Sequence, residues 1–162
     1  IESAYFTPSW RIRRPLERAL RRGTRVAVVT NSPESTDMGI VSVASRGAFD
    51  MLLDVAPTAA LFEWRPDPDA GLGTLHSKVA SFGTCGPVII GSANLDGLSS
   101  EHNTESVVLI YDPVIRTQFD TMFDNDLEAC ERVTTEDVDE SPWFTRLWRR
   151  SILRVGWYWL NG

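Results

Sequence analysis

The sequence predicts an α/β fold, in which a mixed β-sheet is covered by helices on both faces and is followed by a C-terminal amphipathic helix. Strand-like and helical patterns alternate from position 1 to position 65, two strand-like runs are then joined by a short turn, and the segment 143–162 is rich in arginine and tryptophan. With 162 residues, of which 43% are hydrophobic and 23% charged, the chain can bury a core. This composition excludes a disordered chain, a collagen-like repeat and a coiled coil.

The segment 1–65 contains three expected strands and two expected helices. Residues 1–6, 25–30 and 61–64 carry the apolar, aromatic and β-branched side chains that strands favour. Residues 10–22 repeat apolar side chains at helical spacing and end before a glycine, and residues 40–55 are also compatible with a helix. Alternation of this kind places helices against a sheet.

The second half begins with an expected hairpin. Residues 75–82 and 87–92 are two strand-like runs, and the turn residues 83–86 join them. A further strand is expected at 106–111, and a helix with apolar side chains on one face at 115–130.

Composition divides the chain into three parts. Residues 1–131 form one expected domain, residues 132–142 an acidic linker, and residues 143–162 a basic, tryptophan-rich segment. Ile1 is not a plausible initiator, so we expect the chain to be a piece of a longer protein.

Charge and cysteine content narrow the range of partners. The net charge is −6, and because residues 141–162 hold four arginines and no acid, residues 1–140 carry −10. An acidic body repels a phosphate polymer, which argues against a nucleic-acid partner. Cys85 and Cys130 are too few for a disulfide framework or a zinc cluster, so a reducing compartment is expected. The apolar runs are far shorter than the roughly 20 residues that a membrane-spanning helix needs.

The candidate chemistry lies in the second half. His76 and Lys78 are two residues apart in an expected strand, so both should project from one face into one cleft. Ser92 and Asn94, in a GSAN turn, could offer hydrogen bonds there, and Glu105 could fix the histidine tautomer. Imidazole can attack phosphorus or carry a proton, while an ammonium and an amide hold the phosphate oxygens. This set predicts phosphoryl transfer without a metal ion.

A structural interpretation of the same residues stays open. In it, His76 is a satisfied core histidine and Lys78 is a charge that protects a sheet edge from pairing. We expect His102 to be a loop residue beside the site, and Asp96 and Glu101 to be turn or loop residues. The catalytic interpretation requires that His76 and Lys78 lie on the same face of the sheet.

The stretches LHSKVASFG and VIIGSANLDGLSSEHNTE resemble the phospholipase D superfamily, whose motif is H-x-K-x4-D followed by G-S-x-x-N. The resemblance extends from YFTP through TNSPESTD to NTE, and is greatest to the C-terminal half of bacterial cardiolipin synthases and related phosphatidyltransferases. It implies a phospholipase D-like half. His76 matches the catalytic histidine, Lys78 and Asn94 match the phosphate binders, Ser92 the small polar partner, and Glu105 the carboxylate that orients the histidine.

This resemblance implies phosphatidyl transfer between phospholipids through a phosphohistidine, without a cofactor or metal. In the family each half contributes one motif to a shared site, and this chain contains one H-x-K, at His76. The second motif is expected from a missing N-terminal half or from a second copy of the chain. The expected location is the bacterial cytoplasm, peripheral at the inner membrane.

Two departures from the family pattern leave alternatives open. Gly83 occupies the position of the motif aspartate, and seven residues rather than six separate it from Gly91. One alternative is a one-motif phosphodiesterase or nuclease that completes its site as a homodimer. The other is a degenerate half that only scaffolds or binds phosphate.

Residues 143–160 have the pattern of an amphipathic helix. One side of the expected helix is basic, and the opposite side is apolar and aromatic. The apolar side consists of Phe144, Leu147, Trp148, Ile152, Val155 and Trp159, and the basic side of Arg146, Arg149, Arg150 and Arg154. Such a helix lies in a membrane interface or docks its apolar face on the protein, and both possibilities stay open.

Overall fold

The computed structural model describes residues 1–69, 71–139 and 143–159. The strands are β1 (Glu2–Ser3), β2 (Phe6–Thr7), β3 (Ala27–Asn31), β4 (Ala60–Trp64), β5 (Lys78–Ser81), β6 (Val88–Gly91), β7 (Leu95–Asp96), β8 (Val107–Ile110) and β9 (Cys130–Val133). The helices are α1 (Trp10–Arg21), α2 (Gly39–Val55), α3 (Gly97–Glu101), α4 (Pro113–Leu127), α5 (Thr135–Asp139) and α6 (Trp143–Trp159).

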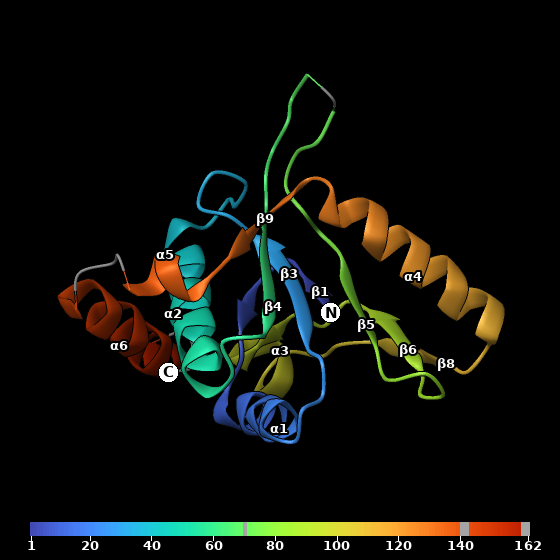
Figure 1. Ribbon diagram of the computed structural model, residues 1–162, viewed down its shortest axis with the longest axis horizontal. Helices are drawn as coiled ribbons and strands as arrows, with labels where there is room; N and C mark the ends of the chain where they lie inside the picture. The colour runs from blue at the N-terminus through green and yellow to red at the C-terminus, as the bar shows by residue number, and fades with distance from the viewer. Residues whose placement is uncertain (70, 140–142, 160–162) are drawn as a thin grey trace.

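One mixed sheet organises the molecule, with strand order β8-β6-β5-β1-β3-β4-β9, and β2 pairs with β7 in a separate two-stranded sheet (Figure 1). Strands β1, β3 and β4 are parallel, whereas β5, β6 and β8 run antiparallel to their neighbours. The predicted hairpin is confirmed: β5 and β6 pair with Val79 opposite Ile90.

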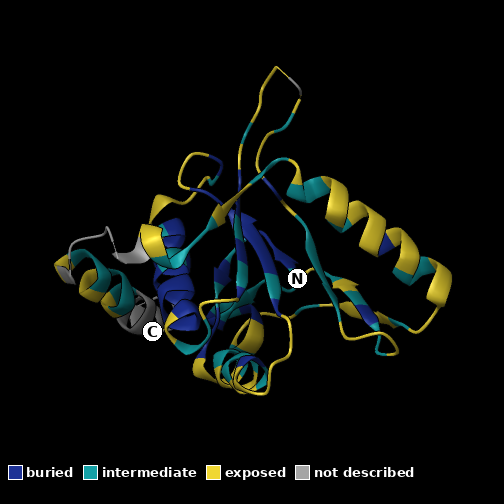
Figure 2. Cartoon of the chain, viewed as in Figure 1, coloured by how far each residue is buried: buried dark blue, intermediate teal, exposed yellow. Residues whose placement is uncertain are grey.

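Helices cover both faces of the sheet, as predicted. Neighbouring residues of β3 point to opposite faces, and both Val28 and Val29 are fully buried. Val28 packs with Leu20 of α1 and Phe49 of α2 in the larger core, whereas Val29 lies in a second core beside Phe123 of α4. The most deeply buried segments therefore lie where β3, β4 and α2 meet (Figure 2).

The pairing directions bring several strand ends together. Because β5 and β8 run opposite to their neighbours, their first residues lie at the same end of the sheet as the last residues of β1, β3 and β6. We call this the site end. It gathers Ser3, Asn31, Lys78, Gly91 and the residues that precede Val107.

The acidic segment expected as a linker at 132–142 begins inside the sheet. Strand β9 pairs antiparallel with β4, with Val133 opposite Leu61, and Val133 packs against the larger core. Glu131 also forms an ion pair with Arg65. Helix α5 follows, and residues 140–142 lie outside the described part. The local composition of β9 is acidic and polar, and it did not indicate that this segment pairs with β4.

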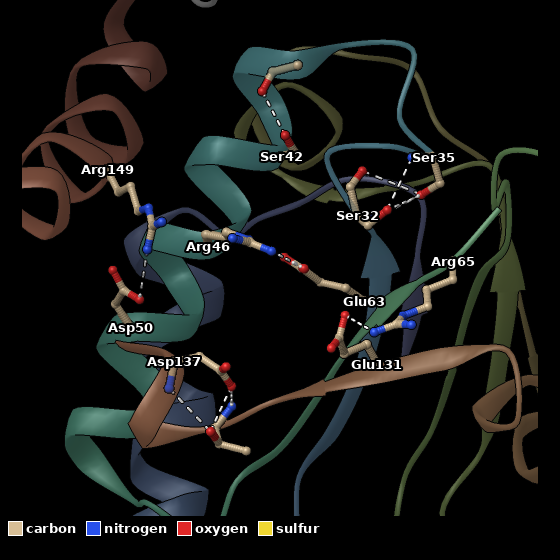
Figure 3. A network of polar contacts seen from close by, with 12 residues as sticks. Ser32, Ser35, Ser42, Arg46, Asp50, Glu63, Arg65, Glu131, Asp137 and Arg149 are labelled. Atoms are coloured by element: carbon tan, nitrogen blue, oxygen red, sulfur yellow. Dashed lines mark hydrogen bonds and ion pairs between the residues drawn. The ribbon is translucent and has the colours of Figure 1, made fainter. Parts of the chain in front are cut away.

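Helix α6 packs on α2 through its basic side, not its apolar side (Figures 1 and 3). Arg146 and Arg150 lie 3.3 and 2.6 Å from the carboxylate oxygens of Asp54, and Arg149 lies 3.9 Å from Asp50. The predicted separation of basic and apolar sides is confirmed where side chains are described. Its orientation differs from the expected docking, because two carboxylates of α2 attract the arginines.

The first half of the apolar side of α6 faces solvent, whereas Ile152 is half-buried. Phe144, Leu147 and Trp148 are 60%, 58% and 58% exposed. The side chains of Val155 and Trp159 lie outside the described residues. Among the helices that the structure describes, none is both long enough and apolar enough to cross a membrane.

Candidate active site

The H-x-K motif lies where the chain enters β5. The Ala4 amide donates to the Ser77 carbonyl over 3.0 Å, so pairing with the β1 segment starts one residue before Lys78. Lys78 is half-buried opposite Ser3, whereas His76 is exposed and precedes the strand. The Lys78 ammonium donates to the His76 carbonyl over 2.9 Å. The lysine therefore also braces the backbone of the motif.

Behind the motif, Glu2 shows which way the alternate side chains point. It lies opposite Val79 and is 1% exposed. Burial, together with the neighbouring Asp126, raises the pKa of Glu2 to about 7, and the Ser77 hydroxyl opposes the shift. Ser77 and Val79 therefore share the face of Glu2, and Lys78 lies on the other face.

A glycine lets β6 and β8 approach closely at the site end. A Cβ atom on Gly91 would lie 2.2 Å from the Ser106 carbonyl oxygen, so no other residue fits without displacing the backbone. Immediately after it, the Ser92 hydroxyl donates to Glu105 over 2.5 Å and accepts from the Ser106 amide over 3.1 Å. Asn103 donates to the other Glu105 oxygen over 3.3 Å.

Opposite charges face one another across this end of the sheet. Hydrogen bonds from Ser92 and then from Ser99 and Asn103 lower the pKa of Glu105, and Lys78 contributes in the same direction. Burial lowers the pKa of Lys78, and Glu105 and a second nearby carboxylate oppose that shift. The structure thus brings Lys78, Ser92 and Glu105 together, from three strands that are separate in the sequence.

Asn94 carries an unused polar group beside them. Its side-chain oxygen is buried and has no hydrogen-bond partner among the described residues. The next residue is fixed firmly, because the Leu95 amide donates to the Ser3 hydroxyl over 2.9 Å and Leu95 pairs with Phe6. The backbone directly after Asn94 is therefore held in place, and the Asn94 Oδ1 is a buried acceptor without a donor among the described residues.

The partners of Glu105 differ from the expected ones. The family resemblance predicts that this carboxylate orients His76, but its two oxygens accept from Ser92 and Asn103. In the part of the chain that the structure describes, the His76 imidazole has no hydrogen-bond partner. His102 is exposed at the end of α3, whose first residues are capped by Asp96 through a 2.6 Å bond to the Ser99 amide.

Sequence reasoning overlooked two further polar groups at the site end. Tyr5 donates to Asp37 over 2.6 Å, and this bond and burial raise the pKa of Tyr5 to about 12. Asn31 is 2% exposed and binds the backbone of Ala4, which follows β1, and of Leu75, which precedes the motif. The only signal was their position in the YFTP and TNSPESTD stretches. Across the described residues, no three His, Cys, Asp or Glu side chains are grouped as a metal site.

A family model decides the assignment of the fold and motif. The model described as "Cardiolipin synthase, PLD-like domain" matches residues 1–127, which include both the H-x-K stretch and the GSAN turn. The chain belongs to this family. The match confirms the predicted resemblance to the phospholipase D superfamily and to the cardiolipin synthases within it.

Curated relatives of this PLD-like domain are considerably longer than the chain. Cardiolipin synthase B of Escherichia coli strain K12 is 32% identical over 148 residues, which cover 91% of the chain and 32% of the relative. A cardiolipin synthase of Clostridium perfringens strain ATCC 13124 is 28% identical over 157 residues, 96% of the chain and 30% of the relative. The chain thus spans about a third of the length of these relatives.

Solved structures share the fold of the PLD-like domain. Phosphatidylserine synthase of Haemophilus influenzae superposes with a TM-score of 0.72 at 16% identity, covering 96% of the chain and 39% of that protein. Nuc of Salmonella typhimurium, a phospholipase D family member, superposes with a TM-score of 0.64 at 19% identity, covering 82% and 79%. These likenesses confirm the predicted mixed sheet with flanking helices.

Proposed function

We propose that the chain is one motif-bearing half of a phosphatidyltransferase that joins phospholipids in the manner of a cardiolipin synthase. The observation that carries this proposal is the grouping of Lys78, Ser92, Asn94 and Glu105 at the site end next to His76, within a PLD-like domain. These residues supply a nucleophile or proton carrier, a cation and amide groups for one phosphate.

The reaction proceeds by two displacements at phosphorus. An imidazole nitrogen attacks the phosphorus of the donor lipid, the new P–N bond forms as the P–O bond to the leaving alcohol breaks, and the second histidine gives that alcohol its proton. The same second histidine then takes a proton from the acceptor hydroxyl. The acceptor oxygen attacks phosphorus and breaks the P–N bond. His76 is one of these two histidines.

The remaining residues stabilise charge on the phosphate oxygens. Lys78 is close enough to Glu105 for their pKa values to affect each other, so its ammonium is held at the site end by charge and by its bond to the His76 carbonyl. The Asn94 Nδ2 group is the one that would donate to a further oxygen of the phosphate, because Oδ1, like the phosphate oxygens, only accepts, and Ser92 positions Glu105. Fixed donors of this kind favour the transition state because they need no reorganisation.

A second motif completes the site, supplied by another part of a longer polypeptide or by a second copy. The threefold greater length of the relatives supports the first arrangement. Next to Glu105, strand β8 exposes Val107, Val108 and Leu109 by 49%, 61% and 50%, a surface that a second half would cover. Phospholipid substrates place the protein peripherally at the inner membrane of a bacterium, on its cytoplasmic side.

Substitution of the motif residues tests the proposal in the whole protein. His76→Ala removes the nucleophile or proton carrier, so phosphatidyl transfer should fall by about a thousandfold or more. Lys78→Arg keeps the charge but replaces a compact ammonium with a planar fork, so the rate should fall at least about tenfold. The measurement is the formation of diphosphatidyl product from labelled phospholipid in mixed micelles.

His102→Ala is the matched control, because this histidine lies near the site in sequence but is exposed at the end of α3. It should retain the wild-type rate. Wild-type rates in both His76→Ala and Lys78→Arg would instead favour a degenerate half that only scaffolds. Hydrolysis of an oligonucleotide, lost in His76→Ala, without lipid transfer would favour the homodimeric nuclease.

A further inference from the structure

Asn31, the last residue of β3, has every hydrogen-bonding position of its side chain occupied. Its Nδ2 donates to the carbonyls of Ala4 and Leu75, each over 2.9 Å. Its Oδ1 accepts from the Leu75 amide and from the Ser35 hydroxyl, also over 2.9 Å. Two donors and two lone pairs are the full capacity of an amide, so these four contacts also fix its orientation.

These contacts hold the backbone directly before the catalytic histidine. Leu75 precedes His76, and both polar groups of the Leu75 backbone bind the one Asn31 side chain. Residues 73–76 precede β5 and the Ser77 carbonyl that first pairs with the β1 segment, so they lie outside the hydrogen-bond ladder that fixes β5. The Leu75 side chain is 5% exposed and packs in the second core beside Val29. Asn31 thus holds the residues directly before His76, which the hydrogen bonds of the sheet do not hold.

The same amide joins three separate segments of the chain at the site end. Through Ala4 it reaches the segment that ends β1, and through Ser35 it reaches the loop after β3. That loop is closed by bonds between Ser32 and Ser35, including one from the Ser32 amide to the Ser35 hydroxyl over 2.9 Å (Figure 3). Displacement of Asn31 would therefore free both polar groups of the Leu75 backbone, while the Ala4 amide would still hold the Ser77 carbonyl.

We propose that Asn31 is a positioning residue that sets the place of the His76 imidazole through the backbone of Leu75. This inference rests on the proposed function in one respect, that His76 takes part in the transfer. Misplacement of a reacting group by about 1 Å can lower a rate about a hundredfold without loss of the fold. Asn31 needs its two N–H donors for this role, because a carboxylate in its place would face two carbonyl oxygens.

Asn31→Asp and Asn31→Ala in the whole protein test the inference, with Ser42→Ala as the matched control. Ser42 is also buried, at 3%, and its hydroxyl donates to the Gly39 carbonyl over 2.8 Å, within α2. Both Asn31 variants should lower kcat for phosphatidyl transfer about 10- to 100-fold with KM changed less than about twofold. Hydrogen exchange at the Leu75 amide should become at least about tenfold faster. Ser42→Ala should change none of these quantities.

Ser35→Ala serves if the Asn31 variants do not fold. It removes the bond to Oδ1 together with the bonds between the Ser35 hydroxyl and Ser32, leaves the other three bonds of Asn31 in place, and should lower kcat about threefold, with faster exchange at the Leu75 amide. Unchanged kcat in folded variants, despite faster exchange at Leu75, would overturn the inference. So would a fall in kcat while the Leu75 amide stays protected, because Asn31 would then act by another route.

The two proposals fail in different ways. If the wild-type protein transfers no phosphatidyl group, the proposed function fails. The positioning role is then decided by hydrogen exchange at Leu75 and by the NMR signals of the His76 imidazole. Both should change in Asn31→Asp and stay the same in Ser42→Ala. Unchanged signals in Asn31→Asp would overturn the positioning role alone.

Discussion

Glu2 is a buried carboxyl group directly behind the motif strand. Burial, together with the neighbouring Asp126, raises its pKa to about 7, so below neutral pH the folded chain holds this proton more tightly than the unfolded chain, where the pKa has its ordinary value near 4.5. The unfolded state loses the proton from about pH 4.5 and the folded state only near pH 7. The contribution of Glu2 to stability therefore declines as pH rises through that window.

Glu2→Gln should remove this pH dependence. Because the amide has no charge to bury, we expect the variant to be more stable than wild type at pH 7.5 by roughly 2 to 3 kcal/mol, and no more stable at pH 4.5. Urea unfolding at a series of pH values from 4.5 to 8 measures the difference. An equal effect of the substitution at both ends of the range would contradict a titrating Glu2.

Glu63→Gln is the matched control, since Glu63 is also a buried carboxyl group, 4% exposed. It receives hydrogen bonds of 2.7 and 2.6 Å from Arg46 (Figure 3). This pairing raises the pKa of Arg46. Loss of the paired charge should destabilise the protein at neutral pH, by about 2 kcal/mol. Both substitutions replace glutamate with glutamine. Near neutral pH, Glu2→Gln should raise the free energy of unfolding, whereas Glu63→Gln should lower it.

At the scale of elements, the β5–β6 turn shows how the chain tolerates the missing motif aspartate. Gly83 has a φ of +56°, a conformation that glycine adopts freely. Arg116 of α4 donates to the Gly83 carbonyl over 2.6 Å and to the Ser81 hydroxyl over 2.7 Å. A residue from another element therefore holds this turn, which lies at the end of β5 remote from Lys78.

Restoring the aspartate should gain little. Gly83→Asp places a side chain at positive φ, at a cost of about 1 kcal/mol, and should change the transfer rate less than about twofold. Arg116→Ala should instead lower the free energy of unfolding by about 1 to 2 kcal/mol, because two charge-assisted hydrogen bonds are lost. Urea unfolding and the lipid assay measure both effects. A tenfold faster Gly83→Asp enzyme would show that the turn, as it stands, limits catalysis.

At the scale of the whole molecule, the orientation of α6 decides how the protein could meet a bilayer. The four arginines of this segment suggested attraction to anionic lipid, at about 1 kcal/mol each. Arg146, Arg149 and Arg150 instead pair with Asp50 and Asp54, which offsets most of that attraction. The exposed aromatic and aliphatic side chains can each contribute about 1.5 to 3 kcal/mol when removed from water. Removal of these apolar side chains from water should therefore contribute more to membrane binding than the arginines do.

Combined substitution of Phe144, Leu147 and Trp148 by serine should release the protein from phospholipid vesicles. Each of these side chains is more than half exposed, so the fold should be unaffected. We expect sedimentation with vesicles to fall at least about tenfold, with little dependence on salt. Tyr111→Ser with Val114→Ser is the control, since these side chains are 71% and 62% exposed on another part of the molecule. Undiminished binding of the triple variant would rule out this face as the membrane contact.

Local patterns in the sequence were sufficient for the elements and for the motif. Spacings of about 3.6 residues marked α1 and α2, a β-branched run marked β3, and an apolar and aromatic run marked β4, because such patterns reflect burial of the element. The alternation that separates Lys78 from Ser77 follows from strand geometry alone. The pairing of β9 was missed, because an edge strand needs few apolar residues and its partner is distant in the sequence, as the pairing of Val133 with Leu61 shows.

What the sequence by itself determined is the set of reactive groups and the elements that carry them: the H-x-K motif at a strand, the GSAN turn and a helix with one basic and one apolar side. The tertiary structure alone decided which groups meet. In the folded chain the arginines of α6 pair with Asp50 and Asp54. Glu105 accepts hydrogen bonds from Ser92 and Asn103, and Asn31 donates to Leu75. The physical reason is that hydrogen bonds and ion pairs depend on distances in space, and sequence periodicity records only which face of an element is buried.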